Sequence, residues 1–114
     1  MTPETAMTRI DSQLSHVWMV RTFLKHSEEA EEEEELCEIH RELYDVMLAL
    51  GQPLSKNDTE AYLRQIRKKI GKLKKTRDRF LELQKEVSGH MNFQMAALSL
   101  NRAVAEIEQI LGTC

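Results

Sequence analysis

Two long blocks of opposite charge constrain how this chain can fold. Between residues 28 and 45 it carries nine Glu and one Asp against a single Arg, and between residues 64 and 79 it carries nine Lys or Arg against a single Asp. The net charge of the whole chain is only -3, so the imbalance is local. If the two blocks lie on neighbouring helices, their attraction favours that pairing and penalises the pairing of like-charged helices.

The composition favours a small all-helical domain. The chain has 114 residues with four Gly and two Pro, and this length is typical of one domain that buries its own core. We expect residues 1–114 to form this single domain. Both Pro residues lie outside the stretches in which apolar residues recur at helical intervals, where they would break a helix.

Apolar residues recur three and four positions apart in four stretches, which predicts four amphipathic helices. Their expected bounds are about 6–26, 28–50, 58–87 and 91–111. Gly51 and Gly112 are expected to end the second and fourth helices. Short connections between them predict an all-α fold, an antiparallel up-down-up-down four-helix bundle.

The boundary between the first two helices is the least marked, because neither Gly nor Pro separates them. Residues 6–50 therefore fit either one long helix or two. We favour a break between His26 and Glu28, because Ser27 suits an N-cap and the carboxylates after it favour the positive end of a helix dipole. The apolar stripe also changes phase between the two stretches, which a turn explains better than one straight helix.

Several polar residues fall on the expected core faces, and hairpin geometry predicts that they meet at one end of the bundle. A turn near Ser27 places Arg21 level with Glu33, and a turn after Gly51 places Arg77 level with Glu31. The expected polar core cluster consists of Arg21, Glu29, Glu32, Glu33 and Arg77.

This cluster has two interpretations. In the first, it is a half-buried set of salt bridges that fixes the register of the helices. In the second, Arg21 and Arg77 remain unpaired and, with Gln84, line a pocket that binds a carboxylate, a phosphate or another small metabolite, with or without catalysis.

A further set of apolar residues lies off the core stripes of the first and last helices. In an up-down bundle these two helices are neighbours, so the set would form one exposed patch or flank the core half-buried. We expect an interface here, because Met-rich surfaces adapt to varied protein partners. The expected interface residues are Met19, Phe23, Met91, Met95 and Leu98.

Other functions have weaker support from the sequence. No Ser-His-Asp, Cys-His or Gly-rich phosphate motif is visible, so there is no catalytic candidate. We expect no metal and no cofactor, because the paired Glu-x-x-His spacing of di-metal bundles is absent. Nucleic-acid binding is disfavoured, because the basic block has an acidic neighbour in its own chain. Cys37 and Cys114 fit reduced thiols.

The start of the chain lacks the pattern of a signal peptide, and no apolar run approaches the roughly 20 residues that span a bilayer. These features predict a cytoplasmic protein without membrane contact. We therefore expect a non-enzymatic helical module for protein interaction or assembly that self-associates, with a homodimer as the simplest form. The alternative is the anion-binding or metabolite-binding bundle around Arg21 and Arg77.

Overall fold

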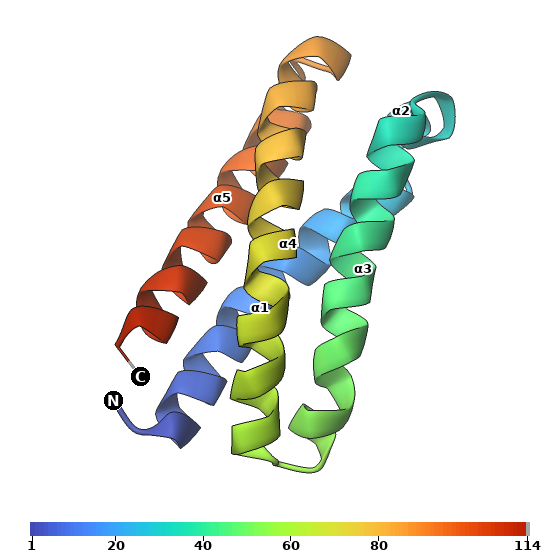
Figure 1. Cartoon of the computed structure of the whole chain (residues 1–114). Helices are drawn as coiled ribbons and strands as arrows, with labels where there is room; N and C mark the ends of the chain where they lie inside the picture. The colour runs from blue at the N-terminus through green and yellow to red at the C-terminus, as the bar shows by residue number, and fades with distance from the viewer. Residues whose placement is uncertain (114) are drawn as a thin grey trace.

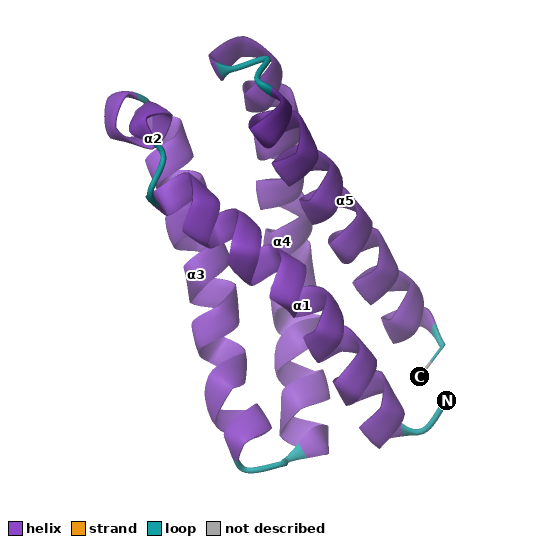
Figure 2. Cartoon of the chain, turned by 180° about the vertical axis from the view of Figure 1, so that it is seen from behind, coloured by secondary structure: helices purple, strands orange, loops and turns teal. Residues whose placement is uncertain are grey.

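A computed structural model describes residues 1–113 of the chain, and within them the regular secondary structure is helical (Figures 1 and 2). There are five helices: α1 (Pro3–Lys25), α2 (Glu28–Glu32), α3 (Glu34–Ser55), α4 (Thr59–Val87) and α5 (Met91–Gly112). The prediction of an all-α fold is confirmed. The predicted count of four is corrected to five, because the second expected helix is divided into α2 and α3.

The four long helices form a closed ring of neighbours. Helix α1 packs against α3 and α5, and α4 packs against the same two helices from the other side. In Figure 2, α1 crosses in front of α4 at an oblique angle, between α3 and α5. The chain reaches the same end of the molecule at its start and after α5 (Figure 1). A regular up-down-up-down four-helix arrangement therefore stays a prediction.

The core is built from the apolar stripes of all five helices. Leu14 of α1, Leu43 of α3, Phe80 of α4 and Leu100 of α5 are each at most 1% exposed. Burial of one such side chain contributes about 1.5–3 kcal/mol. The part of the chain from residue 1 to 113 contains no helix that is both long and apolar enough to cross a membrane.

The break expected near residue 27 is present. Helix α1 ends at Lys25, and Ser27 caps α2 by accepting a hydrogen bond from the Ala30 backbone N–H at 3.2 Å. A second break, which the sequence did not predict, lies at Glu33, where φ is -113° and ψ is 106°. It falls within an unbroken run of Glu, and like charges three or four positions apart destabilise a continuous helix.

Helix α3 continues past Gly51, so the prediction that this glycine ends the helix is wrong. The helix ends after Ser55 in a left-handed residue, Asn57, with φ of 53°. The Asn57 N–H donates to the Leu54 carbonyl at 3.0 Å, and the Asp58 N–H donates to the Pro53 carbonyl at 2.8 Å. These two bonds make a Schellman motif, which satisfies the last carbonyls of the helix. Its signal is the Asn, because Asn tolerates positive φ better than other side chains.

This later turn changes the register between α3 and α4. The turn expected after Gly51 placed Arg77 level with Glu31, whereas in the structure the neighbouring Thr76 donates a hydrogen bond to Glu42, ten residues further along the chain than this register predicts. Arg79 forms ion pairs with Glu35, Glu38 and Glu42, at 3.9, 2.8 and 3.3 Å. The two charge blocks therefore meet. The ion pairs of the basic block reach the later part of the acidic block, residues 35–45, and not its first residues.

Candidate functional site

The set of apolar residues expected at the interface lies on the surface of α1 and α5. Met19 is 64% exposed, Met91 is 68% exposed and Met95 is 51% exposed. Leu98 is 39% exposed, while Phe23 is half-buried and packs edge-to-face on Phe93 with 5.0 Å between the ring centroids. Three large, flexible methionine side chains are thus open to solvent along two neighbouring antiparallel helices.

Four of these residues line a groove between α1 and α5, and Met91 lies outside its lining. Two surface pockets lie along the contact of these helices, and they share Met95 and Ser99, so they form one continuous feature. We call it the α1–α5 groove. Its lining residues are Gln13, His16, Met19, Val20, Phe23, Asn92, Met95, Ala96, Leu98, Ser99, Arg102 and Ala103. All of these residues belong to α1 and α5, whose backbones are shown in Figure 2.

The groove has a small-residue floor and larger walls. Ala96 and Ala103 are buried at its base, and Ser99 between them is half-buried. Met19 and Met95 rise beside them as exposed side chains. The sequence did not predict this floor, because small residues at helical spacing do not show how closely two helices approach each other. Met side chains have three rotatable bonds and adapt to the shape of what they contact.

The charge of the groove differs from that of the chain. None of its lining residues is a carboxylate, although the chain has 19 Asp and Glu. The lining includes Arg102, which forms no ion pair within residues 1–113, and His16. Beyond this end, Glu106 is paired with Arg9 at 3.3 Å and is therefore neutralised.

The structure places Arg21 away from the carboxylates with which it was expected to pair. Its guanidinium carbon lies 4.7 Å from the ring centroid of Trp18 and 4.7 Å from that of Tyr44. The two rings hold the cation by their negatively charged faces. The Arg21 Nε is buried without a hydrogen-bond partner. The residues that hold Arg21 were not predicted, because the approach of Tyr44 on α3 to Arg21 on α1 depends on how the two helices cross.

Arg77 and Gln84 also have partners other than those expected. The Arg77 guanidinium forms ion pairs with Asp78 at 2.9 Å and with Glu108 of α5 at 3.6 Å. The Gln84 amide donates to the Ser88 carbonyl at 2.9 Å, at the end of its own helix. Arg21 therefore contacts α3 and Arg77 contacts α5, and the structure does not join them in one anion pocket.

Glu29, Glu32 and Glu33 meet the end of α4 instead of the arginines. They line a surface pocket with Leu83, Glu86 and Val87. Within residues 1–113, none of the three forms an ion pair, so the expected polar core cluster is corrected. The cause is the register described above, because residues 83–87 of α4, and not its basic block, lie opposite α2.

A pocket between the end of α1 and the start of α3 contains Cys37 and His40 together with Lys25 and Arg41. Burial lowers the pKa of His40, and the positive charges of Arg21, Arg41 and Lys25 lower it further. Cys37 forms no disulfide within residues 1–113, and Cys114 lies outside the described residues. No hydrogen bond joins Cys37 to His40 within residues 1–113, so a nucleophile paired with a base is not formed.

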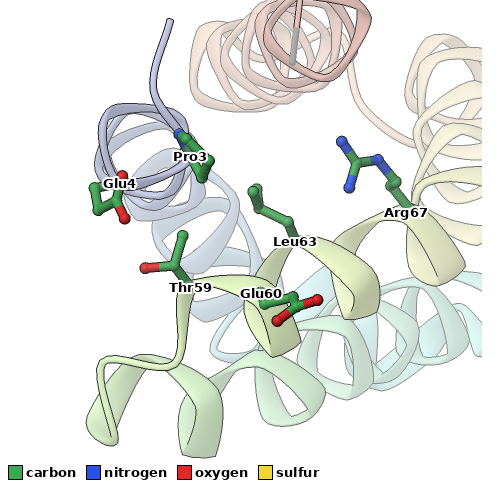
Figure 3. A pocket seen from close by; sticks show the side chains of 6 residues that line it. All are labelled: Pro3, Glu4, Thr59, Glu60, Leu63 and Arg67. Carbon is green, nitrogen blue, oxygen red and sulfur yellow. The ribbon is translucent and has the colours of Figure 1, made fainter.

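One further pocket lies where α1 and α4 begin (Figure 3). Pro3 and Glu4 of α1 and Thr59, Glu60, Leu63 and Arg67 of α4 line it. It holds two carboxylates and a guanidinium but no His or Cys. The sequence missed it, because α1 was expected to begin at residue 6. The signal was Thr2 as N-cap with Pro3 at the first helical position.

Within residues 1–113, no group of three or more His, Cys, Asp or Glu side chains is placed to hold a metal ion. The geometry of the described residues thus offers surfaces for binding. Comparison of the chain with models of protein families, with curated proteins and with solved structures found no match.

Proposed function

We propose that this chain is a non-enzymatic helical protein-interaction module, and that the α1–α5 groove with its methionine walls is its binding surface. The observation that carries the proposal is the exposure of Met19, Met91 and Met95 on two neighbouring helices. Soluble monomers seldom expose contiguous apolar side chains of this size unless they bind something there.

The alternative function, an anion-binding bundle, is not supported by the contacts of Arg21 and Arg77. An anion site around Arg21 and Arg77 needs both guanidinium groups aimed at one ligand. Arg21 is instead held by Trp18 and Tyr44, and Arg77 by Asp78 and Glu108. We therefore retain the interaction module alone.

The simplest form of the proposed function is self-association in the cytoplasm, with the helices acting as one antiparallel up-down bundle. A second copy could place its own Met19 or Met95 in the groove, between Ala96 and Ala103. In a homodimer, one surface then serves both subunits.

Sedimentation velocity at increasing protein concentration tests self-association. We expect the apparent mass of the wild type to rise, and that of the variant Met19→Gln with Met95→Gln to stay at the monomer value. The matched control is Leu48→Gln, which changes a 64% exposed side chain of α3 outside the groove. A wild type that stays monomeric at every concentration contradicts self-association. Protection of Met19, Met91 and Met95 from solvent in that monomer contradicts the interaction surface itself.

A further inference from the structure

We infer that the α1–α5 groove binds an amphipathic helix of another protein, whose apolar stripe is flanked by carboxylates. The inference rests on the proposed binding surface, and it replaces a second copy, the simplest occupant of the groove, by one class of segment from another protein. Three properties of the groove support it: its length, its cross-section and its charge.

The length of the groove fits a short helix. Its lining runs from Gln13 to Phe23 on α1 and from Asn92 to Ala103 on α5. At a rise of about 1.5 Å per residue, each wall is roughly 15 Å long, which is about three helical turns. A partner helix of three turns presents apolar residues at positions i, i+3 or i+4, and i+7 along such a groove.

The cross-section of the groove also favours a helix over an extended peptide. The small side chains of Ala96 and Ser99 let a partner backbone approach closely, while Met19 and Met95 fill the space on either side. An extended strand needs an exposed sheet edge, and residues 1–113 contain no strand. A proline-rich segment needs a groove lined by aromatic residues, whereas Phe23 is the one aromatic side chain in the lining.

The charge of the groove selects carboxylates on the partner. Arg102 lies at one end, no lining residue is acidic, and Glu106 nearby is already paired with Arg9. A second copy of the chain that binds through its own groove places no carboxylate of that groove near Arg102, because the groove lining contains no Asp or Glu. A partner with Asp or Glu beside its apolar stripe does, and complementary charge increases both specificity and the association rate.

Two synthetic peptides test the inference. Both carry the same leucine stripe at helical spacing, and one carries Glu and the other Lys at the flanking positions. Peptide binding is measured by fluorescence anisotropy, and the methionine methyl signals of the protein locate it by NMR. We expect the Glu peptide to bind at least about tenfold more tightly than the Lys peptide and to shift the Met19 and Met95 signals.

Substitutions in the groove supply the controls. Arg102→Glu is expected to weaken binding of the Glu peptide about threefold to tenfold, because an exposed attractive pair becomes repulsive. The matched control is Lys75→Glu, an exposed basic residue of α4 with no ion pair in residues 1–113, which is expected to leave the affinity unchanged. Ser99→Phe fills the groove and is expected to weaken binding at least about tenfold.

Four results overturn the inference. Equal affinity for the two peptides, or no effect of Ser99→Phe, removes the acidic helix as the occupant. If neither peptide binds but the Met19 and Met95 signals shift with protein concentration, the occupant is a second copy, so the inference fails and the proposed function stands. If these signals respond neither to peptide nor to concentration, both fail.

Discussion

Individual neighbouring residues determine which groups the cationic side chains of this bundle contact, and Arg21 is the clearest case. Its position on the core stripe suggested a carboxylate partner, yet two aromatic rings hold it instead. Each cation–π contact contributes about 0.5–1 kcal/mol at an exposed site. The buried Nε without an acceptor offsets part of this stabilisation, because an unsatisfied buried donor costs about 1–3 kcal/mol.

His40 lies close to Arg21 and is expected to make stability depend on pH. Because burial and three neighbouring cations lower its pKa in the folded protein, the unfolded chain takes up the proton first as the pH falls below the ordinary value of 6.5. Stability gained from neutral His40 is therefore present above pH 6.5 and is lost as the pH falls from there.

We expect the free energy of unfolding to fall less steeply with acid in His40→Gln than in the wild type. Lys25→Gln removes one of the cations around the ring, so its slope should lie between the two. Denaturant titrations over the acidic range measure these slopes. Identical slopes for the three proteins would show that His40 is not held neutral by its surroundings.

The periodicity of single residues was sufficient to predict the core but not the partners of the charges. Ile10, Leu14, Val17 and Leu24 share one stripe and all are at most 1% exposed. Periodicity states which face of a helix is buried, because it depends on the helix alone. The partner of Arg21 depends on how two helices cross, and this is set by packing that no single stripe contains.

At the scale of the elements, the ends of the helices determine the register. The predicted break at Ser27 is correct, because its hydroxyl supplies a local cap whose chemistry is visible in the sequence. The end of α3 was predicted five residues too early, because Gly51 fits a helix end locally but the last turn tolerates Pro53 and continues to Ser55. Because the turn lies later in the chain than predicted, residues 83–87 of α4 lie opposite α2 in place of the basic block. Glu29, Glu32 and Glu33 therefore form no ion pair within residues 1–113.

Asn57 is expected to show the strain of the turn between α3 and α4. Its φ of 53° is a conformation that side chains with a β-carbon adopt at a cost, and Asn tolerates it better than most. Asn57→Gly should therefore be neutral or slightly stabilising, while Asn57→Ala should cost about 1 kcal/mol. Thermal or denaturant unfolding of both variants measures this difference. If Ala is as stable as Gly here, the turn does not have this geometry.

Glu42 joins α3 to α4 more closely than the other acidic residues of its block. It accepts a hydrogen bond from the Thr76 hydroxyl at 2.6 Å and pairs with Arg79 at 3.3 Å. The buried Thr76 hydroxyl can donate to the Lys72 carbonyl instead, at 2.9 Å, so Glu42→Ala leaves it satisfied. We therefore expect this substitution to cost the net value of one hydrogen bond, about 0.5–1.5 kcal/mol of unfolding free energy.

The control for this prediction is Glu31→Ala, an exposed acidic residue of α2 that forms no ion pair in residues 1–113. It should change stability by less than about 0.5 kcal/mol. A double-mutant cycle between Glu42 and Arg79 isolates their pair. Equal effects of the two alanine substitutions would show that the charge blocks contribute only through their overall field.

At the scale of the whole molecule, charge and apolar surface are divided between different faces. The ion pairs join α3 to α4 through Arg79 and Lys72, and α4 to α5 through Lys74 and Arg77. The surface between α1 and α5 carries one ion pair, Arg9 with Glu106, and is otherwise marked by the exposed methionines. The sequence located these methionines, because they lie off the core stripe. It did not reveal the groove, whose depth depends on how closely α1 and α5 approach over Ala96 and Ala103.

Solvent exposure of the methionine methyl groups tests the central claim most directly. The chain has six Met, of which Met7 is buried and Met47 is half-buried, so these two are internal controls for Met19, Met91 and Met95. In NMR spectra with a soluble paramagnetic probe, we expect strong broadening of the signals of Met19, Met91 and Met95 and weak broadening of Met7. Addition of the acidic helical peptide should then protect Met19 and Met95. Signals of Met19 and Met95 that are as protected as Met7 in the free protein would contradict an open binding groove.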